Sequence, residues 1–215
     1  GHGALLKNLN NLQGDIVYIK NIDNVVPDRL KEPTIYWKKV LGGYLVQIQS
    51  KINYFLDKLT SSTQDDNFYK EIKGLVCNDL AMEIPLSFDQ WSPMKRNDFL
   101  ISKLDRPLRV CGMVKNKGEP GGGPFWVREP DGSCSLQIVE GAQVNFSSET
   151  QRNIWASATH FNPVDLVCAV RDYRGVPYNL ANYVNSEAFI ISQKPKNGQI
   201  VKALELPGLW NGSLK

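Results

Sequence analysis

The chain has 215 residues, of which 42% are hydrophobic and 22% charged, and its 25 basic and 22 acidic side chains give a net charge of +3. This composition is ordinary for a globular protein, and the scattered basic residues give no indication of nucleic acid as a partner. No stretch approaches the roughly 18 apolar residues that a membrane-spanning helix needs, so no membrane partner is expected. The four cysteines lie far apart without metal-ligand spacing, which favours free thiols and predicts a cytoplasmic protein.

The first 28 residues predict a loop, a short helix, a strand and a polar cluster in that order. Gly1-His2-Gly3 is a tight turn whose bare backbone can approach a flat ligand. Residues 4–12 carry apolar side chains at helical spacing, and residues 16–19 are an apolar run typical of a buried parallel strand. Asp23 and Asn24 follow that strand, and ligands of open α/β sheets bind at the carboxyl ends of strands. The sequence therefore predicts that Asp23 belongs to a functional site.

The middle of the chain is predicted to be helical before a second strand begins. Apolar residues recur every 3.6 positions over residues 31–59, which predicts a long packing helix. Residues 60–67 are polar and predict a flexible linker. A second helix is expected over residues 68–82, and residues 87–106 show no regular pattern. Residues 108–114 then predict a strand that contains a glycine, as strands do where a ligand or another backbone approaches closely.

The loop KNKGEPGGGP, residues 115–124, has two interpretations. Lys115, Lys117 and its four glycines could cradle a phosphate through charge and backbone N–H groups. The same composition also suits a flexible hairpin loop without a ligand. The loop does not match the nucleotide-binding pattern G-x-x-x-x-G-K-[ST].

A hairpin is predicted next, with strands over residues 125–128 and 135–139 around the Pro-Asp-Gly turn at 130–132. Glu140 follows the second strand directly, where it could serve a ligand or simply carry a solvated charge. A short helix is expected over residues 148–155.

The last third of the chain is predicted to contain strands and one more helix. Residues 158–161 suggest a strand, and Asn162 followed by proline suggests a helix cap at the start of a helix over residues 163–173. Further strands are expected over residues 187–191 and 200–206.

Two resemblances add to these predictions. GHG followed by a strand, the pattern N-x-D-N and a further aspartate at Asp28 resemble the UDP-sugar pyrophosphorylases, which are nucleotidyltransferases. Nearly the whole chain is also similar to an uncharacterised bacterial family, a domain of unknown function that resembles a remote branch of that group. The segments that carry this second resemblance are GHGALL, KNIDNVVPD, KGEPGGGPFWV, ATHFNPVDLV and KALELPGLWNG.

The resemblance implies an α/β fold of the GT-A type, with a mixed, mostly parallel sheet flanked by helices and incomplete at its N-terminal side. Residues 1–215 would be the C-terminal portion of a nucleotidyltransferase-like domain, and the rest of a longer polypeptide would be a partner. The Gly-rich phosphate loop of the group is absent, and the group would continue past Lys215 into a strand with a catalytic-type lysine. Ala4 departs from the acidic residue that UDP-glucose enzymes carry after GHG.

The resemblance also implies a site that binds a nucleotide and a sugar phosphate, with Mg²⁺ as a possible cofactor at Asp23. The nucleotide-binding candidates are Gly1, His2, Gly3, Asp23 and Asn24. The sugar- and phosphate-binding candidates are Gly112, Lys115, Lys117, Glu140 and Asn162. His160 is an alternative to Asn162 for a metal or ribose contact, and helix capping would also account for Asn162.

Three functions are compatible with the sequence. The first is nucleotidyl transfer between a sugar phosphate and a nucleoside triphosphate to form a nucleotide-sugar. The second is a nucleotide- or sugar-binding module without turnover. The third is a protein-interaction domain in which Trp126 and Trp210 could anchor an interface.

Overall fold

The fold is mixed α/β, as a computed structural model describes it for residues 3, 5–61, 64–119, 121–128, 132–185 and 188–205. Its helices are α1 (Leu5–Asn11), α2 (Lys31–Ser61), α3 (Asp66–Gly74), α4 (Pro93–Leu104) and α5 (Glu149–Ala156). Its strands are β1 (Ile16–Lys20), β2 (Leu108–Cys111), β3 (Val114–Lys115), β4 (Gly123–Arg128), β5 (Cys134–Val139), β6 (His160–Phe161), β7 (Asp165–Ala169), β8 (Ile190–Lys196) and β9 (Gln199–Glu205). Short helical turns include η2 (Ile22–Asn24), η4 (Leu75–Asp79), η6 (Gly141–Gln143) and η7 (Leu180–Tyr183).

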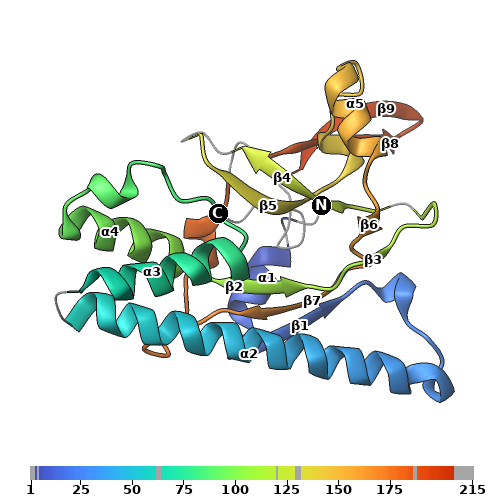
Figure 1. The fold of residues 1–215 in the computed structure, drawn as a ribbon. Helices are drawn as coiled ribbons and strands as arrows, with labels where there is room; N and C mark the ends of the chain where they lie inside the picture. Colours follow the sequence, from blue (N-terminus) through green and yellow to red (C-terminus); the bar gives the residue numbers. More distant parts are fainter. Residues whose placement is uncertain are drawn as a thin grey trace.

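A three-stranded sheet in the order β1-β7-β2 lies at the centre of the described structure (Figure 1). Both pairings are antiparallel: Tyr18 and Val110 lie opposite Val167 from either side. Every other strand pairing in the described residues is antiparallel too. The expected mostly parallel sheet is therefore absent from this part of the chain. Long connections precede β7, and it runs antiparallel to both of its neighbours.

The strand β7 replaces the helix that was predicted over residues 163–173. Its residues Leu166 to Ala169 are 2% exposed or less, since both faces of the central strand are covered. The cap-like residue Asn162 and Pro163 precede a strand here, and the predicted helical start was wrong. An apolar run buried on both faces is favoured in a central strand, where neither face meets water.

One face of the sheet packs on α2, and the other packs on α1 and η7. Leu45 of α2 is fully buried against Val167 and Ala169 of β7. On the opposite face, Leu9 of α1 and Leu180 of η7 cover a cluster that includes Leu166, Cys168 and Val170. Fully burying one such aliphatic side chain contributes about 1.5–3 kcal/mol, so the two faces together fix the sheet between its helices.

The helix α2 confirms the long packing helix that was predicted from the apolar periodicity of residues 31–59. Its buried residues Leu45, Ile48, Ile52, Leu56 and Leu59 follow the 3.6-residue repeat. The C-terminal half of α2 packs with α3, η4 and α4 in the largest apolar cluster of the described structure.

The helix α4 lies within residues 87–106, for which no helix was predicted. Ser92 caps it by accepting a hydrogen bond from the Lys95 amide, and Pro93 occupies its first turn.

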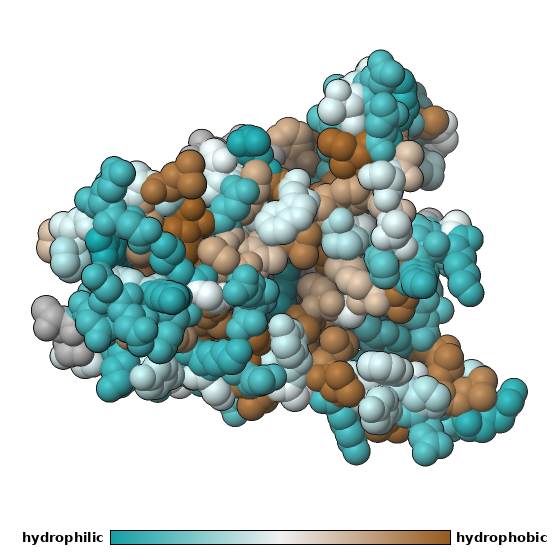
Figure 2. Space-filling model, viewed as in Figure 1, coloured by the Kyte–Doolittle hydropathy of each residue, from teal (hydrophilic) through white to brown (hydrophobic). Residues whose placement is uncertain are grey.

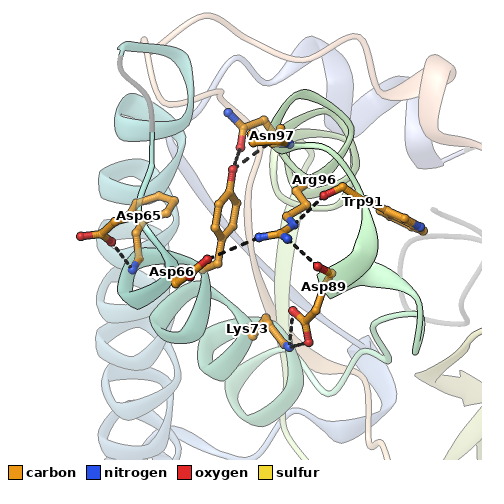
Figure 3. A network of polar contacts seen from close by, with 10 residues as sticks. Asp65, Asp66, Lys73, Asp89, Trp91, Arg96 and Asn97 are labelled. Atoms are coloured by element: carbon orange, nitrogen blue, oxygen red, sulfur yellow. Dashed lines mark hydrogen bonds and ion pairs between the residues drawn. The ribbon is translucent and has the colours of Figure 1, made fainter.

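A polar network joins α3 to α4 beside this apolar cluster (Figure 3). Arg96 donates to the Trp91 carbonyl at 3.1 Å and to the Asp89 carbonyl at 2.5 Å. Its guanidinium group lies 5.0 Å from the Tyr69 ring centroid, and the Tyr69 hydroxyl donates to Asn97 Oδ1 at 2.6 Å. Arg96 therefore fixes the irregular chain before α4 against α3.

The hairpins β4–β5 and β8–β9 and the short pair β3–β6 lie on the far side of the central sheet from α2 (Figure 1). The β4–β5 hairpin confirms the two strands that were predicted over residues 125–128 and 135–139, with Trp126 opposite Leu136. The strands around residues 187–191 and 200–206 are confirmed in part, because β8 begins at Ile190 and pairs with β9 up to Glu205. Trp210 lies outside the described residues.

Candidate functional site

A strained corner between β6 and β7 is the centre of the candidate site. Val164 has a φ of 56°, in the left-handed region that β-branched residues rarely occupy. Such a conformation costs on the order of 1–3 kcal/mol and persists only where surrounding contacts over-determine it. Residues held in this way are enriched at functional sites, which makes the corner at Val164 a candidate site.

Three hydrogen bonds hold the corner in place. The Val164 amide donates to Asn162 Oδ1 at 2.9 Å, and the Val164 carbonyl accepts from the Asn21 amide at 3.0 Å. Asn24 Nδ2 donates to the Pro163 carbonyl at 2.6 Å. The chain just after β1, which carries the nucleotide-binding candidates Asp23 and Asn24, is thereby attached to the chain just before β7.

The buried Asn162 attaches the sugar-side candidates to the same corner. Its Nδ2 donates to the Gly112 carbonyl at 2.6 Å, and its backbone amide donates to the Gly122 carbonyl at 2.8 Å. Asn162 is 4% exposed, and both of its side-chain polar atoms bond to the backbone. In this structure it joins the β2–β3 connection, the Gly-rich loop and the β6–β7 corner.

Glycines allow these segments to approach one another closely. A Cβ atom at Gly112 would lie 3.1 Å from the Asp165 carbonyl oxygen. At Gly122 it would lie 2.6 Å from Ile138 Cγ2 and 3.3 Å from Glu140 Cγ. Any side chain at Gly122 would displace the end of β5, so this loop can lie beside Glu140 only with glycine there.

Lys115 and Lys117 lie at the exposed side of the junction. Lys115 is in β3 and pairs with His160 of β6. The Lys117 amide donates to Glu119 Oε2 at 2.7 Å, and that bond is the largest of the contributions that lower the Glu119 pKa. The Gly118 amide donates to Asn116 Oδ1 at 2.7 Å. Both lysine side chains are exposed to solvent at the start of the Gly-rich loop.

A cluster with more positive than negative charge lies at the start of β7. Lys20 Nζ contacts Asp165 Oδ2 at 2.5 Å, and Lys38 Nζ lies 3.5 Å from Oδ1. The second contact is an ion pair without hydrogen-bond geometry, since Oδ1 is buried and has no hydrogen-bond partner in the described residues. The Asp165 carbonyl accepts from the Gly112 amide at 2.8 Å, which places the cluster directly beside the junction.

Asp23, the candidate magnesium ligand, is an exposed residue of η2. Its amide donates to Asn21 Oδ1 at 3.1 Å, which caps this turn. No group of three metal-binding side chains occurs within the described residues. Mg²⁺ commonly takes one or two protein carboxylates and completes its shell with substrate phosphates and water. Asp23 offers one exposed carboxylate of this kind.

The remaining candidates are placed as follows. Gly1 and His2 lie outside the described residues, and Gly3 is partly buried. Glu140 is half-buried, and its amide donates to Gln143 Oε1 at 2.9 Å. The His160 ring Nδ1 lies 2.9 Å from Thr159 Oγ1. Hydrogen bonds thus join Asn24, through the Pro163 carbonyl, to the corner that holds Asn162 and Gly112. Glu140 lies beside Gly122 of the Gly-rich loop.

Sequence reasoning missed Val164 and the Lys20–Asp165–Lys38 cluster at this junction. It also missed a cleft of about 610 Å³ between β2 and β5, which Arg109 and Gln137 line. Lys20 meets Asp165 through the β1–β7 pairing, whereas Lys38 reaches it from α2, so no local pattern predicts the cluster. A valine in the left-handed region has no sequence signal, although Asn-Pro before it is a known turn pattern.

Comparison with known proteins gives the family but no activity. A family model described as Domain of unknown function (DUF4301) matches residues 1–215. The chain belongs to the DUF4301 family. No curated protein and no solved structure matches the chain. The resemblance to an uncharacterised family is therefore confirmed, whereas the resemblance to UDP-sugar pyrophosphorylases gains no support from these comparisons.

Within the described residues, no helix is long and apolar enough to cross a bilayer.

Proposed function

We propose that the junction around Asn162 binds a phosphorylated small molecule, and that the chain is a nucleotidyltransferase-like domain with a nucleotide on one side of the junction and a sugar phosphate on the other. One observation carries this proposal. The strained Pro163–Val164 corner joins Asn24, on the nucleotide side, to Asn162 and Gly112, on the sugar side. Strain is maintained at a position where several connecting segments have to be held in one arrangement.

The charges around the junction suit an anionic ligand. The ammonium groups of Lys20 and Lys38 share the single carboxylate of Asp165, which leaves a net positive charge. Lys115 and Lys117 add two exposed ammonium groups. Backbone N–H groups of a Gly-rich loop can surround a phosphate that such charges attract. In the proposed complex the two loop lysines bind the phosphate, and the half-buried Glu140 accepts hydrogen bonds from sugar hydroxyls.

For nucleotidyl transfer the protein has to position two phosphorylated reactants and offset their negative charge. Bound Mg²⁺ would supply charge neutralisation of the nucleotide phosphates, and Asp23 is the residue that would hold it. The lysines and loop amides would orient the sugar phosphate. A binding module without turnover would use the same contacts, so binding and turnover have to be measured separately.

Binding is tested by titrating the protein with glucose 1-phosphate and with uridine and other nucleoside triphosphates, with and without Mg²⁺. The double variant Lys115→Ala/Lys117→Ala is expected to weaken sugar-phosphate binding about tenfold or more, since charge-assisted contacts contribute roughly 1.5–3 kcal/mol each. The matched control is Lys58→Ala/Lys70→Ala, which removes two exposed lysines from α2 and α3. Equal losses in both double variants would point to non-specific attraction and contradict the proposed site.

The nucleotide side is tested with Asp23→Asn. We expect this variant to lose the Mg²⁺-dependent part of nucleotide affinity and to keep the Mg²⁺-independent part. Release of pyrophosphate from a nucleoside triphosphate and a sugar phosphate distinguishes an enzyme from a binding module. Nucleotide affinity that is the same with and without Mg²⁺, in both the parent protein and the variant, would remove the proposed role of Asp23.

A further inference from the structure

The strand β2 forms an edge of the central sheet. The sheet order is β1-β7-β2, so β2 pairs with β7 on one side only within the described residues. In an antiparallel pair, successive residues direct their backbone groups alternately towards the partner and away from it. The Gly112 amide bonds to the Asp165 carbonyl, which assigns the outward-facing groups to Arg109 and Cys111. No backbone hydrogen bond outside the sheet involves either residue in the described part of the chain.

The helix α2 carries an exposed apolar row beside this edge. Trp37, Val40 and Tyr44 are 63%, 42% and 45% exposed, although their spacing places them on the same helical face as the buried Ile48. Tyr44 and Ile48 both line the cleft next to β2. Figure 2 shows apolar surface along the N-terminal half of α2 and a hollow between this helix and the hairpin above it. The apolar face with which α2 covers the sheet therefore continues past the edge strand β2.

Arg109 supplies an unsatisfied charge in the same cleft. Its Nη2 donates to Gln137 Oε1 of β5 at 2.9 Å, while its Nη1 is buried without a hydrogen-bond partner in the described residues. A buried donor that lacks an acceptor destabilises the protein, and more so when the group is charged. Two carboxylates that line the cleft are already bonded: Asp79 to Lys51 at 2.7 Å, and Glu83 Oε2 to the Cys134 amide at 2.7 Å. Arg109 thus brings to the cleft a positive charge that no carboxylate of the described residues pairs, and this charge matches an acidic group of a partner.

We propose that the cleft between β2 and β5 binds an extended segment of a partner protein, which adds a strand to the open edge of β2. Such a strand would bond to the backbone groups of Arg109 and Cys111, as peptides do when they extend a sheet. Alternate side chains of the added strand would face α2 and cover Tyr44 and Val40, so apolar residues are required there. The side chains between them would face Arg109, where one acidic residue pairs with the guanidinium charge.

A second copy of the chain is a poorer occupant of this edge. Two chains paired through β2 would bring two Arg109 guanidinium groups into one cleft, where repulsion between like charges opposes the pairing. An acidic strand from a different protein has the complementary charge. The cleft volume of about 610 Å³ also exceeds what one side chain fills, as an extended segment requires.

The experiment uses fluorescein-labelled synthetic peptides of seven residues that alternate valine with threonine and carry one central glutamate. Fluorescence anisotropy of this peptide against the protein should show saturable binding, and a central lysine in place of glutamate should abolish it. N-methylation of the peptide amides at alternate positions tests strand pairing in the unaltered protein. One set of alternate positions should prevent binding and the other set should leave it intact, because only one edge of the peptide pairs with β2.

Variants of the protein locate the site. Arg109→Gln should weaken binding of the glutamate peptide about tenfold, whereas Arg128→Gln on the exposed end of β4 should leave it unchanged. Tyr44→Ala should weaken binding, because Tyr44 lines the cleft, and Tyr54→Ala, which truncates a similarly exposed tyrosine of α2 outside the cleft, should not. The proposal is overturned if no peptide of the panel binds, or if both N-methylated sets bind alike. It is also overturned if analytical ultracentrifugation shows a dimer that excludes the peptide, since a second copy would then occupy the edge.

Discussion

The Tyr18 side chain of β1 lies across Gly42 of α2, and a Cβ atom at position 42 would stand 1.9 Å from the Tyr18 hydroxyl oxygen. That hydroxyl donates to the Lys38 carbonyl at 3.2 Å, and the Lys38 ammonium group lies 5.5 Å from the Tyr18 ring centroid. The missing side chain at Gly42 thus allows the sheet and α2 to meet at this point. The neighbouring Gly43 has nothing within 4 Å of its corresponding Cβ position.

The two adjacent glycines predict opposite effects of alanine. Gly43→Ala should raise the free energy of unfolding by about 0.5–1 kcal/mol, because alanine favours a helix interior over glycine. Gly42→Ala gains the same propensity but displaces the Tyr18 hydroxyl and breaks its hydrogen bond, so it should be at least about 1 kcal/mol less stable than Gly43→Ala. Urea denaturation measures both. Adding Tyr18→Phe to Gly42→Ala should reduce the gap, and equal stabilisation by both alanines would contradict the contact.

Arg96 is predicted to matter more for stability than the exposed ion pair next to it. Arg96→Met removes two hydrogen bonds to backbone carbonyls and the contact with the Tyr69 ring, at an expected cost of about 2–3 kcal/mol (Figure 3). Arg96→Lys should recover little, because one ammonium group does not reproduce the guanidinium fork. Lys73→Met breaks a more exposed pair with Asp89 and should cost under about 1 kcal/mol. A larger loss of stability in thermal unfolding for Lys73→Met than for Arg96→Met would refute this assignment.

Tyr178 is predicted to make the protein sensitive to alkaline pH. Burial, followed by the 2.6 Å hydrogen bond that its hydroxyl donates to Asp105, raises the pKa of Tyr178 well above the ordinary 10.0. Above about pH 10 the unfolded chain releases this proton while the folded chain keeps it. The free energy of unfolding therefore falls as pH rises, by up to about 1.4 kcal/mol per pH unit from this group.

Urea denaturation between pH 8 and pH 11 measures this dependence. Tyr178→Phe should flatten the fall relative to the parent protein, whereas Tyr36→Phe, at an exposed position of α2, should leave it unchanged. Burial also raises the pKa of the Cys168 thiol to about 12 and acts in the same direction, so the flattening is partial. A Tyr178→Phe variant with the parent slope would count against the buried hydroxyl.

The cysteines are predicted to react with iodoacetamide in an order set by burial. Cys77 is exposed and should be alkylated first in the folded protein. Cys168 is 2% exposed and its thiol has a pKa of about 12, so its thiolate is scarce and inaccessible at neutral pH. Mass spectrometry of time points should find Cys168 modified only after urea is added. Modification of Cys168 at the rate of Cys77 in the folded protein would show that the β7 face is open.

The sequence by itself determined the elements that depend on local patterns. The apolar repeat of residues 31–59 predicted α2, because a helix buries residues at the same spacing wherever it packs. The two short strand-like runs around a Pro-Asp-Gly turn predicted the β4–β5 hairpin, whose two strands are neighbours in the chain. The glycine at position 112 was predicted to mark a close approach, and the Asp165 carbonyl is found there.

Only the tertiary structure decided the strand directions and the relations between distant residues. β7 pairs with β1 across about 145 positions, and nothing within residues 163–173 records that partner, so a capped helix was the locally favoured prediction. The same limit applies to Arg109, which is one polar residue among apolar neighbours until β5 brings Gln137 to one of its nitrogens and leaves the other unsatisfied. Backbone pairing and the burial of charge depend on what surrounds a residue in space. Local sequence patterns report only what a residue's neighbours along the chain require.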